Sequence, residues 1–435
     1  MVVPRIPFDI LGPIFTHYVE YDIVEYPIET LLLVCREWKE AALGHSALWN
    51  QFNIYLGHYP CFNVWSSRLP LRLQRCRPNA PLYITLRNYL NMSLWQYANY
   101  HTQETAIYSP RPCKRVTGLS SNCLCDAEMP AFIERIIKFF IGPDGTRSAR
   151  WRHFEVDLGG CIDDARSNRA IAVALSQPTP MLETLVLKNV RMGMECAGLR
   201  LFPDIKSVNS ITILDSRLTV FPNFVKVQKA TLGWEFGDTS NQGLDIRPSA
   251  ARLRYLRMSV NQMASIILPP ILPALTHLHL SGDDISPSLY EWDMPRLAAL
   301  TVDIGNNDLI DLFTDCESLH AEKLRTVTVR WYQSQAGYWL KARLLESLPR
   351  LLFQFPNIDT IRMNRWILDL LLKVIWELPQ ESRRAVTSGK RVTNMDLDCF
   401  YGFDGTEDNH SLELLAAEWE LVPPNLPYQE FIDAL

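Results

Sequence analysis

The sequence predicts an α/β protein in which a short helical N-terminal unit precedes a long, irregular repeat solenoid with a parallel sheet on its inner side. Three observations carry this prediction. The chain has 435 residues, roughly two to three times the usual domain length. Apolar triplets recur from about residue 151 to residue 363, and the first sixty or so residues carry apolar side chains at helical spacing. A composition of 47% apolar and 21% charged residues excludes disordered, collagen-like and coiled-coil classes.

The solenoid prediction comes from an L-x-x-L-x-L template. Its copies begin at Leu182, Val208, Val227, Leu253, Leu275, Leu297, Leu324 and Ile358, and a looser copy begins at Trp151. Helix-like segments are expected at 133–140, 164–176, 308–319, 338–355 and 366–378. Neither the strand nor the helix of one unit can bury its apolar face alone, so the units must stack on one another.

These copies resemble the leucine-rich-repeat family over about residues 151 to 365. In that family an Asn after each strand makes a ladder of hydrogen bonds from side chain to backbone. Asn261 matches the pattern, and Ser216 and Asp283 match it approximately. The other copies lack it, so the resemblance implies a divergent and irregular solenoid.

The N-terminal helical unit is predicted from two apolar stripes. The first contains Ile10, Leu11, Ile14 and Phe15, and the second contains Leu31, Val34, Cys35 and Trp38, each spaced to share one face of a helix. Pro13 removes a backbone donor, so the first helix is expected to be kinked or to begin late. A unit of about 50 residues has little interior volume, so some of these side chains should face the repeats or a partner.

Three short motifs occur in order between positions 6 and 52. They are Ile6-Pro7-Phe8-Asp9-Ile10-Leu11, Leu31-Leu32-Leu33-Val34-Cys35-Arg36-Glu37-Trp38 and Leu48-Trp49. Together they resemble an F-box, and the stretch 65–86 is similar to the link between F-box and repeats in many fungal F-box proteins. Ile6, Asp9, Pro13 and an insertion at 21–26 depart from the F-box pattern.

The resemblance implies a substrate-recognition adaptor of an SCF-type cullin-RING ubiquitin ligase. Its F-box would bind the Skp-type adaptor, and through it the cullin, while the repeats would bind a target protein for ubiquitin-dependent degradation. The adaptor contacts carried over from the family are Pro7, Ile10, Leu11, Ile14, Phe15, Leu31, Val34, Cys35, Trp38, Leu48 and Trp49. The alternative for several of them, including Ile14, Val34 and Trp49, is that they form the core of the helical unit itself.

Strand alternation predicts the target-binding surface. Residues flanking the buried positions of each copy should point out from the inner sheet face. They include Lys188, Thr212, Thr231, Arg257, His277, His279, Asp303, Thr328, Arg330, Arg362 and Asn364. The arginines suit bidentate contacts with a carboxylate or a phosphate, and Trp331 and Trp366 suit anchoring positions. An ordinary solvated sheet face is the alternative.

We expect four segments: an F-box-like helical domain at 1–57, a linker and N-terminal cap at 58–150, the solenoid at 151–365, and a C-terminal cap with an acidic tail at 366–435. The first residues do not read as a secretory signal, and no stretch approaches 18 apolar residues. The ten cysteines are irregularly spaced, which is typical of a reduced protein. An intracellular location, in the cytoplasm or the nucleus, is therefore expected, with no membrane partner.

The net charge of −5 hides two opposite regions. Residues 59–117 carry eight bases and one acid, whereas residues 395–435 carry ten acids and no base. There are three alternatives for these regions. Either both are solvated surfaces, or the basic region is a docking site, or the basic and acidic regions pair with each other. A single-stranded nucleic acid would suit the basic segment with Trp65, Tyr83, Tyr89, Trp95 and Tyr97, but the acidic chain with no recognised binding module argues against it, and no nucleic-acid partner is expected.

The chain is not expected to be an enzyme. Nucleophile-elbow, phosphate-loop, dinucleotide-binding and zinc-protease motifs are absent. His277 and His279, with Asp283, Asp284 or Asp303, make an incomplete metal set, and Cys113, Cys123 and Cys125 lack zinc-site spacing. No catalytic residue, metal or cofactor is therefore expected. The second functional hypothesis is a repeat scaffold for protein–protein interaction whose F-box is degenerate.

Overall fold

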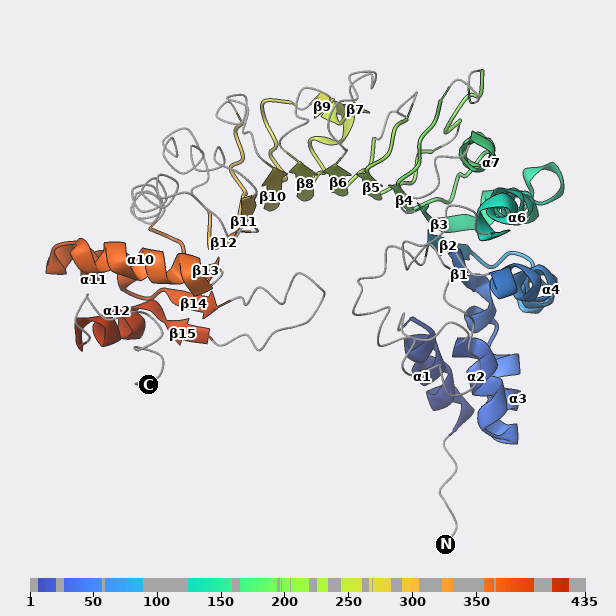
Figure 1. Cartoon of the computed structure of the whole chain (residues 1–435), viewed down its shortest axis with the longest axis horizontal. Coiled ribbons are helices and arrows are strands. Elements are labelled where there is room, and N and C mark those ends of the chain that lie inside the picture. Colours follow the sequence, from blue (N-terminus) through green and yellow to red (C-terminus); the bar gives the residue numbers. More distant parts are fainter. Residues whose placement is uncertain are drawn as a thin grey trace, which may run out of the picture. The chain divides into compact units, whose positions relative to one another are not determined.

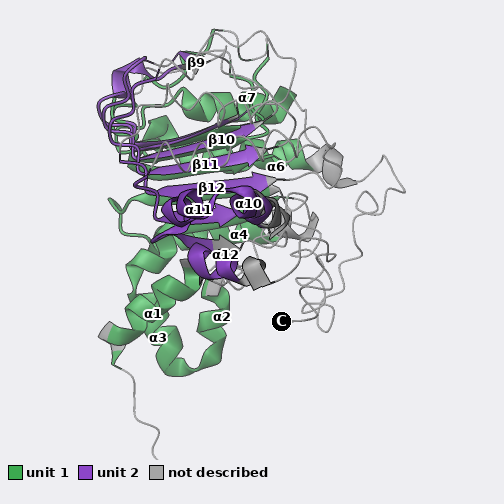
Figure 2. Cartoon of the chain, turned by 90° about the vertical axis from the view of Figure 1, so that its left-hand side faces the viewer, with its two compact units in different colours: residues 1–226, 238–242 green, residues 227–237, 243–435 purple. Residues whose placement is uncertain are grey.

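A computed structural model describes the chain in segments. These are residues 7–20, 27–56, 59–88, 124–158, 165–193, 196, 198–203, 205–218, 225–233, 244–259, 266–267, 269–282, 292–304, 323–331, 356–363, 365–394 and 409–421. The chain divides into two compact units (Figure 2). Unit 1 is residues 1–226 with 238–242, and unit 2 is residues 227–237 with 243–435.

Unit 1 begins with short helices. They are α1 (Phe8–Glu20), α2 (Pro27–Val34), α3 (Arg36–Gly44) and the 3-10 turn η1 (Ser46–Asn50). α1 continues through Pro13, so the helix is not broken at this proline. Gly12 precedes this proline, and a Cβ at Gly12 would lie 2.9 Å from the ring of His45. The glycine therefore permits the close approach of this ring to α1.

Cys35 separates two helices where the apolar spacing predicts one. Its backbone is extended, with φ −160° and ψ 172°, and its Sγ accepts a hydrogen bond from the backbone N–H of Trp38. Cys35 is thus the N-cap of α3, a position in which a side-chain acceptor satisfies a helix-terminal donor. The prediction of a single helical stripe through Leu31, Val34, Cys35 and Trp38 is wrong because this cap turns the chain.

The sheet of unit 1 follows these helices. Its strands β1 (Gln51–Leu56), β2 (Leu82–Asn88), β3 (Trp151–Asp157), β4 (Thr184–Lys188) and β5 (Ser210–Leu214) pair in parallel in chain order (Figure 1). Helices α4 (Tyr59–Arg75), α6 (Leu124–Ile141) and α7 (Ala165–Leu175) connect them, with turns η3 (Pro143–Gly145) and η4 (Ser148–Arg150) before β3. Phe52 of β1 packs edge-on against Phe140 of α6, so the apolar side of these strands faces a helix.

Unit 2 repeats the strand arrangement. Strands β6 (Lys229–Gly233), β8 (Tyr255–Ser259), β10 (His277–Gly282), β11 (Ala299–Ile304), β12 (Thr326–Trp331), β13 (Thr360–Met363) and β14 (Arg391–Asn394) pair in parallel, and β15 (Asn409–Ser411) is antiparallel to β14. A small pair, β7 (Leu244–Asp245) and β9 (Ile266–Ile267), flanks the turn η6 (Arg247–Ser249). Helices α10 (Arg365–Glu377), α11 (Gln380–Thr387) and α12 (Leu412–Leu421) complete it.

The α/β class and the parallel stacking of the repeat strands are confirmed. The second and third apolar positions of successive copies occupy the same register, as Leu185 with Ile211 and Leu187 with Ile213 do in unit 1. Register and burial hold in unit 2 as well, where Leu256 pairs with Leu278 and both are buried. The apolar template therefore marks the residues that form the continuous core of each stack.

The sheet also extends outside the range expected for the solenoid. β1 and β2 pair with β3, although they precede residue 151, and β14 pairs with β13 beyond residue 365. Of the expected helices, 133–140 lies in α6, α7 covers 165–175 of the expected 164–176, and α10 covers 366–377 of the expected 366–378. The segments 308–319 and 338–355 lie outside the described residues.

One position of the expected hydrogen-bond ladder is occupied. The Ser216 hydroxyl accepts a hydrogen bond from the backbone N–H of Val190 at 3.1 Å and donates one to the carbonyl of Leu214 at 2.8 Å. This buried side chain thereby links two neighbouring repeats. Asn261 and Asp283, the other two ladder positions, lie outside the described residues. Among the helices that are described, none has the length and apolarity needed to cross a membrane.

Candidate binding surfaces

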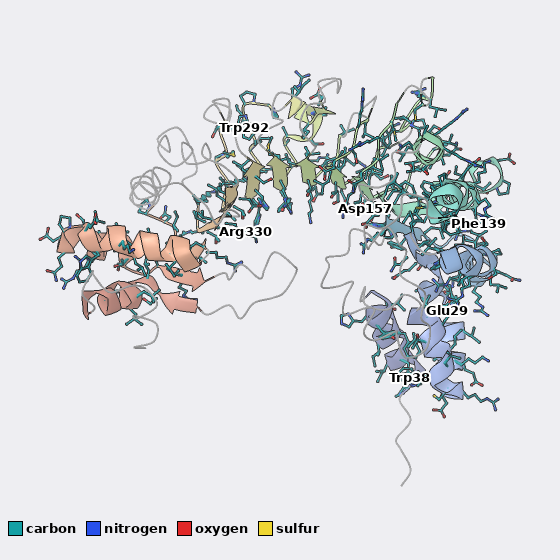
Figure 3. The ribbon with its side chains drawn as sticks, in the orientation of Figure 1. Glu29, Trp38, Phe139, Asp157, Trp292 and Arg330 are labelled. Carbon is teal, nitrogen blue, oxygen red and sulfur yellow. The ribbon has the colours of Figure 1, made fainter. Side chains whose placement is uncertain are left out.

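The polar face of unit 1 lies opposite its apolar core and contains a nearly balanced set of charges. Residues two apart on a strand share a face, so Arg87 of β2, Glu155 and Asp157 of β3 and Lys188 of β4 all lie on this face (Figure 3, where Asp157 is labelled). We call it the unit 1 polar face. Glu155 and Asp157 are buried, although both are acids.

Glu155 is the most heavily paired group on the unit 1 polar face. Arg87 donates to both of its oxygens, from Nε at 2.9 Å and from a terminal nitrogen at 3.2 Å. His153 Nε2 lies 3.4 Å away and Lys188 Nζ 3.9 Å away. Burial alone raises the pKa of the Glu155 carboxyl, but hydrogen bonds from His153 and Arg87 and the charges of Arg87 and Lys188 outweigh it and lower the pKa to about 2.

Asp157 is satisfied in a similar way at the end of β3. Asn189 donates its side-chain amide to Asp157 Oδ1 at 2.9 Å, and Lys188 Nζ lies 4.0 Å from Oδ2. Asn189 has φ +56°, a left-handed conformation that Asn tolerates better than most residues. The turn after β4 therefore aims this amide at the neighbouring strand, and the unit 1 polar face is internally neutralised.

The polar face of unit 2 is built in the same way and carries a different charge balance. On strands β6 to β14 it presents five bases, Lys229, Arg257, Arg330, Arg362 and Arg391, two histidines, His277 and His279, and within these described strands a single acid, Asp303. We call this the unit 2 polar face. Its positive charges outnumber its negative charge, whereas on the unit 1 polar face the two signs match.

Asp303 is the centre of the unit 2 polar face. Its side chain is 2% exposed, and its Oδ2 lies 2.5 Å from His279 Nε2 and 3.9 Å from a terminal nitrogen of Arg257. A terminal nitrogen of Arg330 approaches Oδ1 only to 4.0 Å, beyond hydrogen-bond distance. Three basic side chains from strands β8, β10 and β12 thus converge on one carboxylate of β11. Figure 3 labels Arg330, the contributor from β12.

Several buried atoms on this face have unused hydrogen-bonding capacity. Asp303 Oδ1 and the Nε atoms of Arg330 and Arg362 are buried and form no hydrogen bond among the described residues. Buried polar atoms in native proteins are normally paired, and each exception asks for an explanation. The unit 2 polar face therefore has guanidinium donors that its own acid does not satisfy.

The predicted target-binding residues divide between these two faces. Arg257, His279, Asp303 and Arg330 are brought together, and Arg362 lies on the strand next to Arg330. Lys188 lies apart in unit 1, where it neutralises Glu155 and Asp157. His277 is exposed, with Nδ1 2.9 Å from the hydroxyl of the neighbouring Thr276.

Thr212, Thr231 and Thr328 occupy the expected sheet face. Asn364 lies outside the described residues. Trp331 ends β12 and Trp366 lies in α10, and the placement of these two side chains is not described.

Sequence reasoning missed Glu155, Asp157 and Arg87. The alternation that predicts Lys188 also applies to the looser copy at Trp151, where Glu155 and Asp157 flank the buried Val156. The same period in 82–88 places Arg87 between buried strand positions and the strand end. Extending the alternation one copy earlier than the full template would therefore have found this ion-paired cluster.

The N-terminal helices divide the predicted adaptor contacts into two groups. Leu11, Phe15, Leu31, Leu48 and Trp49 are at most 2% exposed, so they form the core of the helical unit and are not available to a partner in this conformation. The other group consists of Pro7, Ile10, Ile14, Val34 and Cys35, which are exposed, and Trp38, which is half-buried. Trp38 packs against Phe15 with ring centroids 5.1 Å apart.

The alternative assignment of Ile14 and Val34 to the core of the helical unit is wrong. Ile14 is 45% exposed and Val34 is 54% exposed, and the neighbouring Ile10 and Leu33 are 50% and 85% exposed. For Trp49 the same assignment is confirmed, since this residue is 1% exposed and donates its indole N–H to the carbonyl of Ala42 at 3.0 Å. The filled core leaves four large apolar side chains of α1 and α2 in contact with solvent.

A pocket of about 480 Å³ lies between α2 and α3. Its lining combines apolar side chains with charged ones and contains Leu32, Leu33, Cys35, Arg36, Lys39, Glu40 and Leu43. Arg36 and Glu40 pair across one turn of α3 at 2.9 Å. The break at Cys35 creates this pocket, because it turns α3 away from the line of α2.

Part of the basic segment at 59–117 is used inside unit 1. Arg72 donates to both oxygens of Glu29 of α2, with a shortest distance of 2.6 Å, and its guanidinium stacks 4.7 Å from the ring centre of the buried Trp65. Arg75 lies over Trp49 in the same way. Trp65 is 1% exposed, so it cannot stack on a base as the nucleic-acid hypothesis needs. Tyr89, Trp95 and Tyr97 lie outside the described residues.

Metal ligation was the remaining alternative for His277 and His279. Among the described residues no group of three or more His, Cys, Asp or Glu side chains is placed to hold a metal ion. Asp283, Asp284, Cys113 and Cys123 lie outside the part of the chain that the structure describes. A comparison with models of known protein families finds no match, and a comparison with curated proteins finds no similar sequence.

Proposed function

We propose that this chain is a substrate-recognition adaptor of an SCF-type ubiquitin ligase, in which the N-terminal helices are an F-box that binds a Skp-type adaptor. The single observation that carries the proposal is the set of apolar side chains that α1 and α2 leave exposed although their core is filled. Ile10, Ile14, Leu33 and Val34 are each at least 45% exposed. Their order along the chain matches the F-box motifs of the sequence.

The energetics of these side chains favour a protein partner. Burying a large aliphatic side chain fully stabilises by about 1.5–3 kcal/mol, and exposed apolar groups gathered on a small unit are typical of interaction sites. In an F-box, this surface would contact the Skp-type adaptor and through it the cullin. Such a complex would act in the cytoplasm or the nucleus.

The second part of the proposal concerns the sheets. We assign the stacked strands to an irregular, leucine-rich-repeat-like solenoid, for which the Ser216 bridge between repeats is supporting evidence. The unit 2 polar face would then capture the target protein for ubiquitin-dependent degradation. The unsatisfied guanidinium donors of this face favour it over the internally neutralised unit 1 polar face.

Capture of a purified Skp-type adaptor by the full chain tests the proposal. The chain should bind at micromolar concentration or below, and the double substitution Ile10→Asp with Val34→Asp should weaken binding at least about ten-fold, as loss of interface anchors does. Leu71→Asp is the matched control, because Leu71 is also 54% exposed but lies on α4, outside the F-box motifs. Circular dichroism of each variant checks that the fold is retained.

Failure of the intact chain to capture the adaptor would contradict the proposal. It would favour the second candidate, a repeat scaffold with a degenerate F-box. The observation on its side is Pro13 inside α1, where proline removes a helical hydrogen bond. Replacing Pro13 with Ala separates the two, because a degenerate F-box damaged mainly by this proline should gain adaptor binding.

A further inference from the structure

The unit 2 polar face has an excess of positive charge at a defined place. Arg257 and Arg330 flank the single carboxylate of Asp303, and Arg362 lies on the next strand, β13, opposite Thr328. The three arginines and one carboxylate leave two positive charges without a counter-charge among the described residues of this cluster. Neighbouring strands lie about 4.8 Å apart and two residues along a strand span about 6.6 Å, so Arg330 and the diagonal Arg362 begin roughly 8 Å apart. Long side chains bridge such a distance easily.

The donors on this face are positioned but not used. The Nε atoms of Arg330 and Arg362 are buried without a hydrogen bond among the described residues, and Arg330 stays 4.0 Å from Asp303. Side-chain exposures of 37% for Arg330 and 43% for Arg257 leave their guanidinium groups accessible from solvent. A ligand can therefore reach the exposed part of these guanidinium groups without disturbing the core, and a small rotation of an arginine side chain brings its unused Nε donor to the ligand.

We propose that this cluster binds a phosphate monoester group, with Arg257, Arg330 and Arg362 as its cationic contacts and Asp303 as the group that orients Arg257 and Arg330. A phosphate monoester carries about two negative charges near neutral pH and three strong acceptor oxygens, which match the excess charge and the number of guanidinium groups. Arg forms bidentate hydrogen bonds with phosphate. A carboxylate carries one charge and satisfies fewer donors.

The binding of phosphate follows from the face alone, whereas its use to recognise a phosphorylated target rests on the proposed function. Unit 1 provides the contrast within the same chain. There the bidentate arginine, Arg87, already holds the buried Glu155. No phosphate binding is expected on the unit 1 polar face.

The test uses the full chain and two probes at constant ionic strength. The probes are inorganic phosphate and a short peptide with one phosphoserine and no other charged side chain. Its unphosphorylated form is the peptide control, and sodium chloride is the salt control. Phosphate should raise the melting temperature of the chain more than chloride does, and the phosphopeptide should bind at least about ten-fold tighter than the unphosphorylated peptide.

Arg330→Gln with Arg362→Gln should weaken phosphate binding at least about ten-fold. Arg252→Gln with Arg296→Gln is the matched control, since it removes the same charge from exposed residues in turns that precede β8 and β11. Arg330→Lys keeps the charge with fewer donors and should show an intermediate loss, which separates guanidinium recognition from charge alone.

Three results would overturn the phosphate site. They are equal stabilisation by phosphate and chloride, equal loss in the two double variants, or no difference between the phosphorylated and unphosphorylated peptides together with no effect of inorganic phosphate. Phosphate also stabilises folded proteins non-specifically, so only a response that Arg330→Gln with Arg362→Gln loses and Arg252→Gln with Arg296→Gln keeps supports the site. Such a response without binding of the phosphopeptide favours a small phosphorylated molecule as the ligand. Capture of the Skp-type adaptor is measured on the same preparations, so failure of the unaltered chain to bind phosphate, with capture intact, refutes this inference alone.

Discussion

The two polar faces have the same architecture but differ in charge balance: the unit 1 polar face is internally neutralised, and the unit 2 polar face carries an excess of positive charge. In unit 1, Glu155 receives two hydrogen bonds from Arg87 and lies near His153 and Lys188. In unit 2, one carboxylate, Asp303, is surrounded by more cations than it satisfies. The parallel strands therefore fix only where the polar side chains lie. The identity of those side chains decides whether their charges neutralise one another or are left for a ligand.

The comparison also shows where buried charge stabilises. A buried ion pair contributes little net stability compared with apolar packing, but removing one partner is costly because the other charge remains buried. In unit 1, Arg87 and Glu155 form such an ion pair, in which the carboxylate is buried. The arginine side chains Arg257 and Arg330 of unit 2 are partly exposed, so they are free to exchange water for a ligand.

The same substitution on the two faces should give the largest difference. Arg87→Met should destabilise unit 1 by about 3 kcal/mol, because it leaves Glu155 buried without its bidentate partner. Arg330→Met should change the stability of unit 2 by no more than about 0.5 kcal/mol, because it removes a partly exposed charge and a buried unpaired donor. Hydrogen exchange of the β3 and β12 amide groups reports on the two units separately. Equal losses would mean that the faces do not differ in this way.

The pH dependence of unit 1 should reveal Glu155. Its pKa in the folded chain, about 2, is lower than the ordinary value of 4.5. Its contribution to stability is therefore complete above about pH 4.5 and is lost as the pH falls toward 2, amounting to about 3 kcal/mol at most. Urea unfolding between pH 6 and pH 2 should show a steeper loss for the unaltered chain than for Glu155→Gln. Parallel curves would show that this carboxyl is not held ionised by its neighbours.

Salt should have the smallest effect, and it should stabilise unit 2 but not unit 1. Raising sodium chloride from low concentration should stabilise unit 2 by a few tenths of a kcal/mol, because it screens repulsion among partly exposed arginines. Unit 1, with attractive pairs, should be unchanged or slightly destabilised. The melting temperature of Arg330→Met should respond less to salt than that of the unaltered chain, and an equal response would remove the electrostatic explanation.

The apolar template was sufficient to predict the repeating strands, since Leu185, Leu187 and their register partners are the residues that the stack buries. Alternation also predicted that Arg257, Asp303 and Arg330 share a face. It could not predict that Lys188 forms an ion pair with Glu155. Such pairing depends on which side chains of neighbouring strands the folded stack brings together. At the N-terminus, helical spacing placed Cys35 inside a helix, and the capping hydrogen bond to its sulfur overrode that pattern.

The sequence also could not predict which apolar residues of the N-terminal helices are buried. Leu11 and Ile14 occupy the same predicted stripe, yet Leu11 is 2% exposed and Ile14 is 45% exposed. A stripe identifies the apolar face of a helix, but it does not separate the residues that pack within the unit from those that stay exposed on its surface. Only the packing of α1 against α2, α3 and η1 makes that division.

Hydrogen exchange of the full chain with and without phosphate tests the asymmetry of the two faces most directly. At constant ionic strength, phosphate should slow exchange in β8, β10, β11, β12 and β13 and leave β2, β3 and β4 unchanged. Arg330→Gln with Arg362→Gln should abolish that protection. Protection of β2 to β4 instead, or no protection in either unit, would contradict the account of the unit 2 polar face as the available one.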